Sequence, residues 1–93
     1  MITAAQMRAA RALLGIDQKT LAAEAGVSVP TIQRMEASSG NVRGVVASLV
    51  RVIEALDALG IELIGEGAPS QGTGRGVRLK SPPAAPPFQT TTD

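Results

Sequence analysis

The stretch QKTLAAEAGVSVPTIQRME, residues 18–36, constrains the fold more than any other part of the chain. Its apolar residues keep a helical rhythm on both sides of Ala-Gly-Val-Ser at 25–28, where that rhythm breaks. Glycine takes the left-handed conformation that ends a helix without steric cost. Ser28 can cap the helix that follows, and Pro30 falls in its first turn, where no backbone N–H is needed. The pattern predicts two short helices joined by a tight turn, over about residues 18–25 and 29–36.

Two further helices are predicted around this pair. Thr3 and Gln6 have the spacing of a capping box, and Gly15 can end the helix that starts there. After the loop residues at 37–41, the run VRGVVASLVRVIEALDALG again places apolar residues at helical spacing. The first helix is predicted over about 4–14 and the fourth over about 43–59.

Beyond Gly60 the pattern changes. IELI at 61–64 and VRLK at 77–80 alternate apolar and polar residues, as half-buried strands do, and a glycine-rich loop separates them. The last residues, 81–93, are proline-rich and typical of a disordered tail. The predicted fold is mostly α: a small helix-turn-helix bundle of four helices with a C-terminal β-hairpin or strand pair and a disordered tail. The expected units are a helix-turn-helix domain at 1–60, a β-strand dimerisation segment at 61–80, and the tail at 81–93.

Composition excludes several kinds of protein. The 93 residues suit one small domain, and the chain has no cysteine and no histidine, so we expect no disulfide, no metal site and no cofactor. Phe88 is the only aromatic residue, which leaves no stacking platform for single-stranded nucleic acid. No apolar run is long enough to span a bilayer and no signal layout is present, so we expect a cytoplasmic protein without a membrane partner. Without histidine, cysteine or paired carboxylates in a plausible pocket, we expect no enzyme.

Residues 3–60 resemble the Cro and phage-repressor helix-turn-helix family, the xenobiotic-response-element type found in prokaryotic regulators. The resemblance is specific because several independent positions agree: small or apolar residues at the helix crossing, glycine at the turn, and apolar residues facing the core. The matching residues are Gln18, Leu21, Ala22, the Ala-Gly-Val-Ser turn at 25–28, Ile32, and Arg-Met-Glu at 34–36.

The resemblance implies that the third helix enters the major groove of double-stranded DNA. Arg34 can contact guanine, Gln33 can contact adenine, and Val29 or Thr31 can meet a thymine methyl group. The full set of expected base-reading residues is Ser28, Val29, Thr31, Gln33 and Arg34. The expected phosphate contacts are Gln18, Lys19, Asn41 and Arg43. The resemblance also implies a structural ion pair between Arg11 and Glu36.

Two functions follow from these features. The first is a sequence-specific transcription regulator, such as a repressor, that binds a palindromic operator as a homodimer. The alternative is an antitoxin-type protein that binds a toxin partner and autoregulates its own operon. Family members often add a fifth helix that this chain lacks, so dimerisation is expected to use residues 61–80, with the fourth helix as the other possibility.

Overall fold

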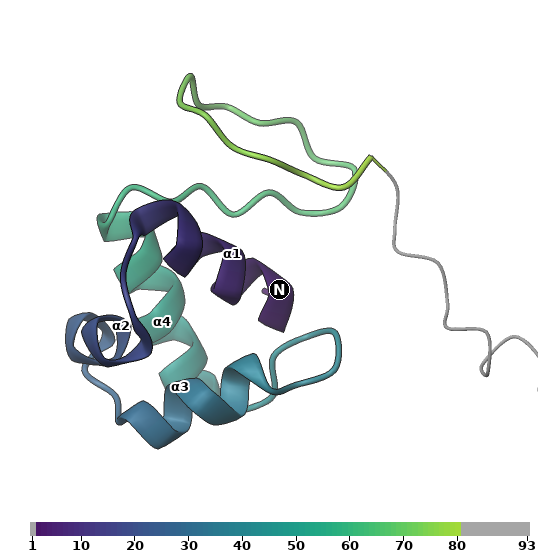
Figure 1. Cartoon of the computed structure of the whole chain (residues 1–93). Helices are drawn as coiled ribbons and strands as arrows, with labels where there is room; N and C mark the ends of the chain where they lie inside the picture. Colours follow the sequence, from purple (N-terminus) through teal and green to yellow (C-terminus); the bar gives the residue numbers. More distant parts are fainter. Residues whose placement is uncertain (1, 81–93) are drawn as a thin grey trace, which may run out of the picture.

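Four helices pack around one apolar core in the computed structural model, which describes residues 2–80 (Figure 1). The first three helices have the predicted bounds, and the fourth is shorter than predicted. The helices are α1 (Ala4–Leu14), α2 (Gln18–Ala25), α3 (Val29–Glu36) and α4 (Val46–Ala58).

The helix ends use local capping. Thr3 and Gln6 form the predicted capping box, in which each side chain accepts a hydrogen bond from the other residue's backbone N–H, at 3.0 and 2.9 Å. Asp17 caps α2 by accepting a 2.7 Å hydrogen bond from the backbone N–H of Thr20. Gly26 ends α2 at φ +70°, a left-handed conformation that an L side chain would strain. Ser28 caps α3, so the chain passes from the end of α2 at Ala25 to the start of α3 at Val29 within four residues.

The start of α4 differs from the prediction. Residues 40–42 pair with the N-terminal segment instead: Ala4 donates to the Gly40 carbonyl at 2.9 Å, and Val42 donates to the Ile2 carbonyl at 3.0 Å. Val42 is buried in this extended connection. Beyond this pairing, the Arg43 N–H donates to Ser38 Oγ and Val45 is extended at φ −67°, ψ 134°, so the helix begins only at Val46.

The core draws on every helix. The first helix packs against α3, and α2 packs against both α3 and α4. Ala22 is buried on α2, where a small residue lets the helices approach closely. The largest fully buried side chains are Ile2, Met7, Leu21, Ile32, Met35, Val52 and Leu56.

The predicted β-hairpin or strand pair is wrong: within residues 2–80 the only β-type pairing is an isolated bridge between Thr3 and Asn41. Residues 61–80 form an irregular excursion that doubles back on itself (Figure 1). The two alternating runs bury different amounts of apolar surface. Ile61 and Leu63 pack against the helical core, whereas Val77 and Leu79 lie in solvent, so the runs share no apolar face.

Side chains hold the excursion together in place of a strand ladder. Glu62 accepts hydrogen bonds from the Ser70 hydroxyl at 2.8 Å and from the backbone N–H groups of Gln71 and Gly72 at 2.7 and 3.2 Å. Arg78 donates to the carbonyl of Ala68 at 2.6 Å and to that of Gly65 at 3.4 Å. The packed unit thus extends past residue 60, and the tail predicted at 81–93 lies outside the described residues. Among residues 2–80, no helix combines the length and apolarity needed to cross a membrane.

The packing predicts a clear contrast between two apolar truncations. Ile32→Ala should lower the free energy of unfolding by about 2–5 kcal/mol, because it opens a cavity in the core between α3 and its neighbours. Leu13→Ala should change it little, because that side chain is 56% exposed. Urea denaturation followed by circular dichroism would measure both, and equal losses would contradict this assignment of the core.

Candidate nucleic-acid interface

The turn between α2 and α3 sets the outer face of α3. The backbone N–H of Val27 donates to the Ala22 carbonyl at 3.0 Å, which closes the end of α2 directly before α3 begins. Ile32 and Met35 are buried against the other helices. The opposite face of α3 is therefore turned to solvent, as a helix that enters a DNA groove must be.

Three predicted base-reading residues form one hydrogen-bonded row along α3. The Ser28 and Thr31 hydroxyl oxygens are 2.8 Å apart, and the backbone N–H of Thr31 donates to Ser28 Oγ at 3.3 Å. Arg34 Nη2 in turn donates to Thr31 Oγ1 at 3.3 Å. Ser28 is thus used as the helix cap, while Thr31 orients the guanidinium of Arg34.

The other two predicted base-reading residues are placed differently. Gln33 is exposed next to Arg34. Val29 is half-buried and packs against the hydrophobic core, so only part of its side chain is available to a ligand. The most accessible chemistry of α3 is therefore the amide of Gln33 and the guanidinium of Arg34.

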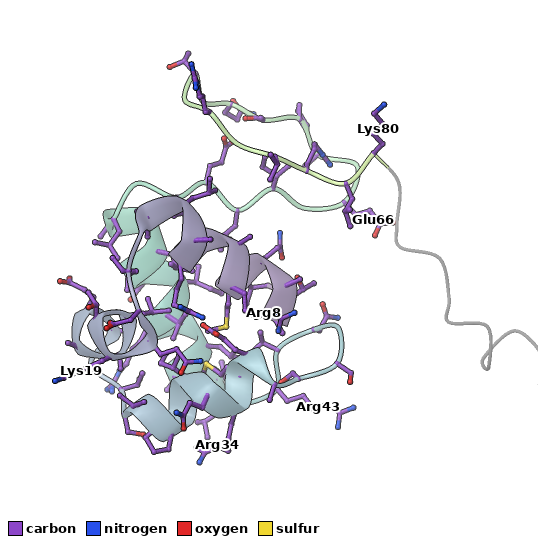
Figure 2. All side chains as sticks on the ribbon, viewed as in Figure 1. Arg8, Lys19, Arg34, Arg43, Glu66 and Lys80 are labelled. Atoms are coloured by element: carbon purple, nitrogen blue, oxygen red, sulfur yellow. The ribbon has the colours of Figure 1, made fainter. Side chains whose placement is uncertain are left out.

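Three of the predicted phosphate contacts, Lys19, Asn41 and Arg43, are exposed around this helix. In Figure 2, Lys19 of α2 and Arg43 of the following loop point outward on the same side of the molecule as the base reader Arg34 of α3. The backbone N–H of Arg43 donates to Ser38 Oγ at 3.2 Å, which holds the loop while its side chain extends into solvent. Asn41 is exposed in the same loop and its backbone forms the bridge to Thr3.

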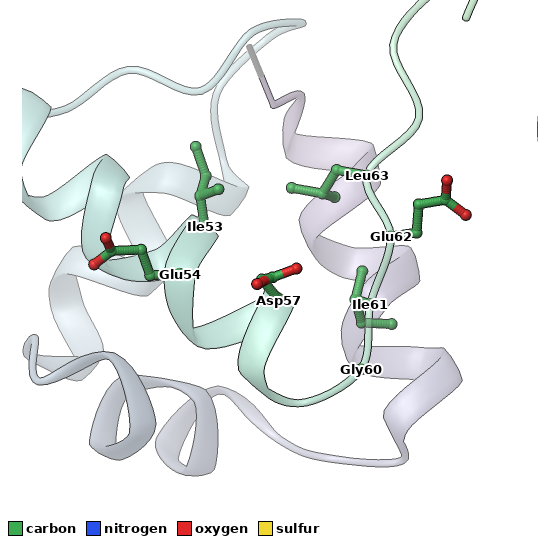
Figure 3. A pocket seen from close by; sticks show the side chains of 7 residues that line it. All are labelled: Ile53, Glu54, Asp57, Gly60, Ile61, Glu62 and Leu63. Carbon is green, nitrogen blue, oxygen red and sulfur yellow. The ribbon is translucent and has the colours of Figure 1, made fainter. Parts of the chain in front are cut away.

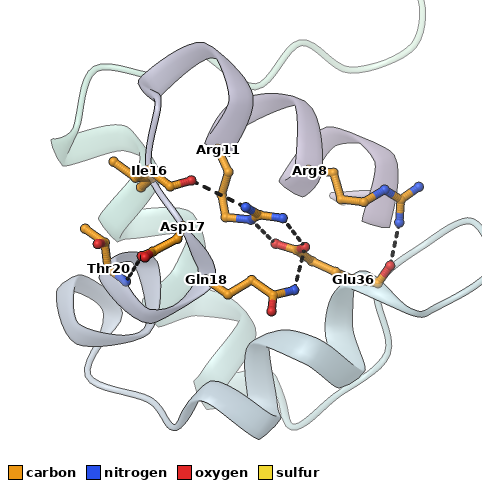
Figure 4. Close-up of polar contacts among 7 residues, drawn as sticks. All are labelled: Arg8, Arg11, Ile16, Asp17, Gln18, Thr20 and Glu36. Carbon is orange, nitrogen blue, oxygen red and sulfur yellow. Dashed lines mark hydrogen bonds and ion pairs between the residues drawn. The ribbon is translucent and has the colours of Figure 1, made fainter.

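Gln18, the fourth predicted phosphate contact, lies in an internal network (Figure 4). Its amide Nε2 donates to Glu36 Oε1 at 3.0 Å. Arg11 binds the same carboxylate with Nε to Oε2 at 2.6 Å and Nη2 to Oε1 at 2.7 Å, so Arg11 and Glu36 form a bidentate ion pair. The side chain of Glu36 is only 4% exposed, and both of its oxygens have partners.

Arg8 adds a contact that the sequence analysis did not identify. Its guanidinium donates to the backbone carbonyl of Glu36 at the end of α3 (Figure 4). A helix ends with unpaired carbonyls and partial negative charge, so a cation there stabilises it. The available signal was the spacing of Arg8 and Arg11, which places both on one face of α1.

The network shifts the acidity of Glu36. Burial raises the pKa of this carboxyl, but the hydrogen bonds from Arg11 and Gln18 and the positive charges of Arg11 and Arg8 outweigh burial, and the net pKa is lowered. At the start of α2, hydrogen bonds from Thr20 lower the pKa of Asp17. Since Asp17 is anionic and already uses a backbone donor there, the N-terminus of α2 is less suited to a phosphate than a bare helix end would be.

Residues 2–80 contain no group of three or more side chains placed to hold a metal ion. What they do contain is a helix-turn-helix whose second helix presents an amide and a guanidinium, flanked by cations on α2 and on the next loop. This arrangement defines a DNA-binding protein.

The comparison with protein families supports this assignment as a DNA-binding protein. A helix-turn-helix family model matches residues 7–64, more than half of the chain, and the chain therefore belongs to this family, of the Cro and phage-repressor type. It is a DNA-binding regulator of transcription. No curated protein and no solved structure gave a significant match.

The ion pair leads to a stability prediction. Arg11→Ala should lower the free energy of unfolding by about 3 kcal/mol, because it leaves the Glu36 carboxylate buried without its main partner. Arg51→Ala, which removes an exposed arginine with only a 3.5 Å hydrogen bond to the Gly26 carbonyl, is the matched control and should change stability by less than about 0.5 kcal/mol. Thermal or urea unfolding of both variants measures the difference, and similar stabilities would show that the pair contributes little.

The lowered pKa of Glu36 also gives a pH dependence. A carboxyl whose pKa is lower in the folded state stabilises the protein above its unfolded pKa of about 4.3, and this contribution is lost as the pH falls through the folded pKa. The free energy of unfolding should therefore fall more steeply below about pH 5 in the natural protein than in Glu36→Gln. Urea titrations between about pH 7 and pH 3 compare the slopes, and parallel curves would contradict the assignment.

Proposed function

We propose that this chain is a sequence-specific regulator that binds a palindromic operator as a homodimer, with α3 in the major groove of each half-site. The outward row on α3 is the observation that carries the proposal. Arg34 is held by Thr31, which has Ser28 as its own partner, so the guanidinium is partly oriented before DNA arrives. Orientation in the free protein reduces the entropy lost on binding.

Arg34 and Gln33 carry the base reading in this proposal. A guanidinium can donate two hydrogen bonds to the O6 and N7 atoms of guanine, and a glutamine amide can pair with the N6 and N7 atoms of adenine. Both side chains are exposed on α3. Thr31 and the exposed part of Val29 supply methyl groups suited to the thymine methyl.

Phosphate contacts on both sides of α3 would position the helix. Lys19 lies on α2, and Asn41 and Arg43 lie in the loop after α3, so the set brackets the recognition helix (Figure 2). Gln18 already donates one amide hydrogen to Glu36, so we expect a phosphate to meet either its second amide hydrogen or its backbone N–H. The main role of Gln18 in this proposal is to hold α2 against the end of α3.

A homodimer is proposed because one module of this size makes few DNA contacts. Helix-turn-helix proteins place two recognition helices about 34 Å apart on successive turns of one DNA face. A two-fold axis between two copies satisfies this spacing and predicts a palindromic site.

The test begins by selecting bound sequences from a random DNA pool with the full chain. A palindrome with half-site centres about ten base pairs apart is expected. Arg34→Ala should then cost about 1–3 kcal/mol on the selected site while leaving binding to scrambled DNA largely unchanged. Lys19→Ala should weaken binding to both DNAs alike and reduce its salt dependence.

Arg51→Ala, on α4, provides the control for the loss of a positive charge outside α2, α3 and the loop between α3 and α4. Equal losses on both DNAs for Arg34→Ala would assign Arg34 to phosphate contact. Selection that returns no common sequence would contradict specific operator binding and would favour the alternative in which a protein partner is the main ligand.

A further inference from the structure

The far side of the bundle from α3 carries a groove that the DNA-binding face does not use. The C-terminal half of α4 and the extended segment after it enclose about 610 Å³ (Figure 3). Its apolar residues, Ile53, Ile61 and Leu63, are half-buried and also pack against the core. A groove of this kind leaves apolar surface in water unless something covers it.

The rim of this groove is acidic. Glu54, Asp57 and Glu62 line it, and no lysine or arginine does (Figure 3). Glu62 is occupied by residues 70–72 of its own loop. Glu54 and Asp57 are exposed and form no ion pair among residues 2–80. The groove therefore suits a segment with apolar side chains and positive charge.

The same chain carries such a segment. Residues 75–80, Arg-Gly-Val-Arg-Leu-Lys, which we term the arm, alternate apolar and basic side chains. Val77 is 84% exposed and Leu79 is 67% exposed. Arg78, which lies between them, donates to the carbonyls of Gly65 and Ala68 of its own chain. Since neighbouring side chains of an extended segment point to opposite sides, anchoring Arg78 turns Val77 and Leu79 outward.

The Arg78 contacts favour binding of the arm to a groove on another molecule and not to the groove of its own chain. The Arg78 contacts hold the arm along residues 65–68, and its two apolar side chains stay in solvent instead of entering the groove of their own subunit. A second copy can receive the arm with both Arg78 contacts intact. Each copy offers one arm and one groove, so a two-fold pair makes the same contact twice.

We infer that the groove formed by α4 and residues 61–63 receives the arm of a second copy of this chain. Val77 and Leu79 cover Ile53, Ile61 and Leu63. Arg75, which lies on the same side of the arm as Val77 and Leu79, lies against Glu54 and Asp57. The C-terminal end of α4 and the segment that leads to the arm lie across the bundle from α3, so this exchange leaves both recognition helices free (Figure 1). The inference rests on the proposed homodimer and names its interface.

The first test uses the full chain in gel filtration with light scattering over about a hundredfold range of concentration. The double variant Val77→Ser/Leu79→Ser should weaken the dimer at least about tenfold, because it removes the apolar contact twice in each pair. Val45→Ser/Val46→Ser is the matched control: these valines are 71% and 73% exposed but lie outside the groove. Thermal melts check that all variants fold.

Charge reversal tests the pairing itself. Glu54→Lys/Asp57→Lys and Arg75→Glu should each weaken the dimer about tenfold or more, and their combination should restore it to within about threefold of the natural chain. Arm variants that dimerise like the natural chain, or a combination without restoration, would overturn the inference.

Cross-linking separates a second copy from the chain's own arm. The chain has no cysteine, so Asp57→Cys and Val77→Cys can be placed on different chains and mixed. A mixed disulfide dimer supports exchange. A disulfide that forms only when both changes share one chain, with the mass of a monomer, would overturn it.

These outcomes are distinct from failure of the proposed function. A dimer that ignores every arm and groove variant would remove this interface and leave the operator-binding homodimer standing. A chain that binds its selected DNA site only as a monomer would remove both.

Discussion

The buried carboxylate of Glu36 is the interaction on which the arrangement of the helices depends. It lies at the end of α3, where the helix dipole disfavours a negative charge, and its side chain is almost completely shielded from water. It is tolerated because Arg11 of α1 binds both of its oxygens and Gln18 of α2 adds a third hydrogen bond. One side chain thus ties three helices together, and the orientation of α3 follows from it.

This network also separates two uses of polar residues that look alike in the sequence. Gln18 was predicted to contact phosphate, yet its amide donates to the Glu36 side chain, while Arg8 donates to the Glu36 backbone carbonyl. Lys19, Arg34 and Arg43 remain directed to solvent (Figure 2). The polar residues that turn inward support the recognition helix, and those that turn outward are available to the DNA.

The segment after Gly60 has a similar division of roles. Ile61 and Leu63 complete the helical core, while Glu62 and Arg78 tie the glycine-rich excursion to itself. What remains outside is a short row of apolar and basic side chains, opposite in character to the acidic groove on the same molecule. A protein whose DNA-binding unit is small gains from such a connection between copies, because DNA affinity then draws on two modules.

Local sequence determined the bounds of α1, α2 and α3, because their signals are short-range: Thr3 with Gln6, Asp17, Gly26 and Ser28 act within one turn of the helix end. The resemblance to the family also predicted the partner of Arg11 and the exposure of Gln33 and Arg34 on α3, whereas Val29, predicted with them, is half-buried. The tertiary structure decided what depends on distant segments. Residues 40–42 form an extended connection that pairs with residues 2–4, and α4 starts only after it, at Val46. The apolar alternation at 61–64 and 77–80 produced no hairpin, because the first run packs half-buried against the helical core and the second lies in solvent. Period-two alternation shows that a segment has two unlike faces, but only the packed helices determine whether a partner for the apolar face exists in the same chain.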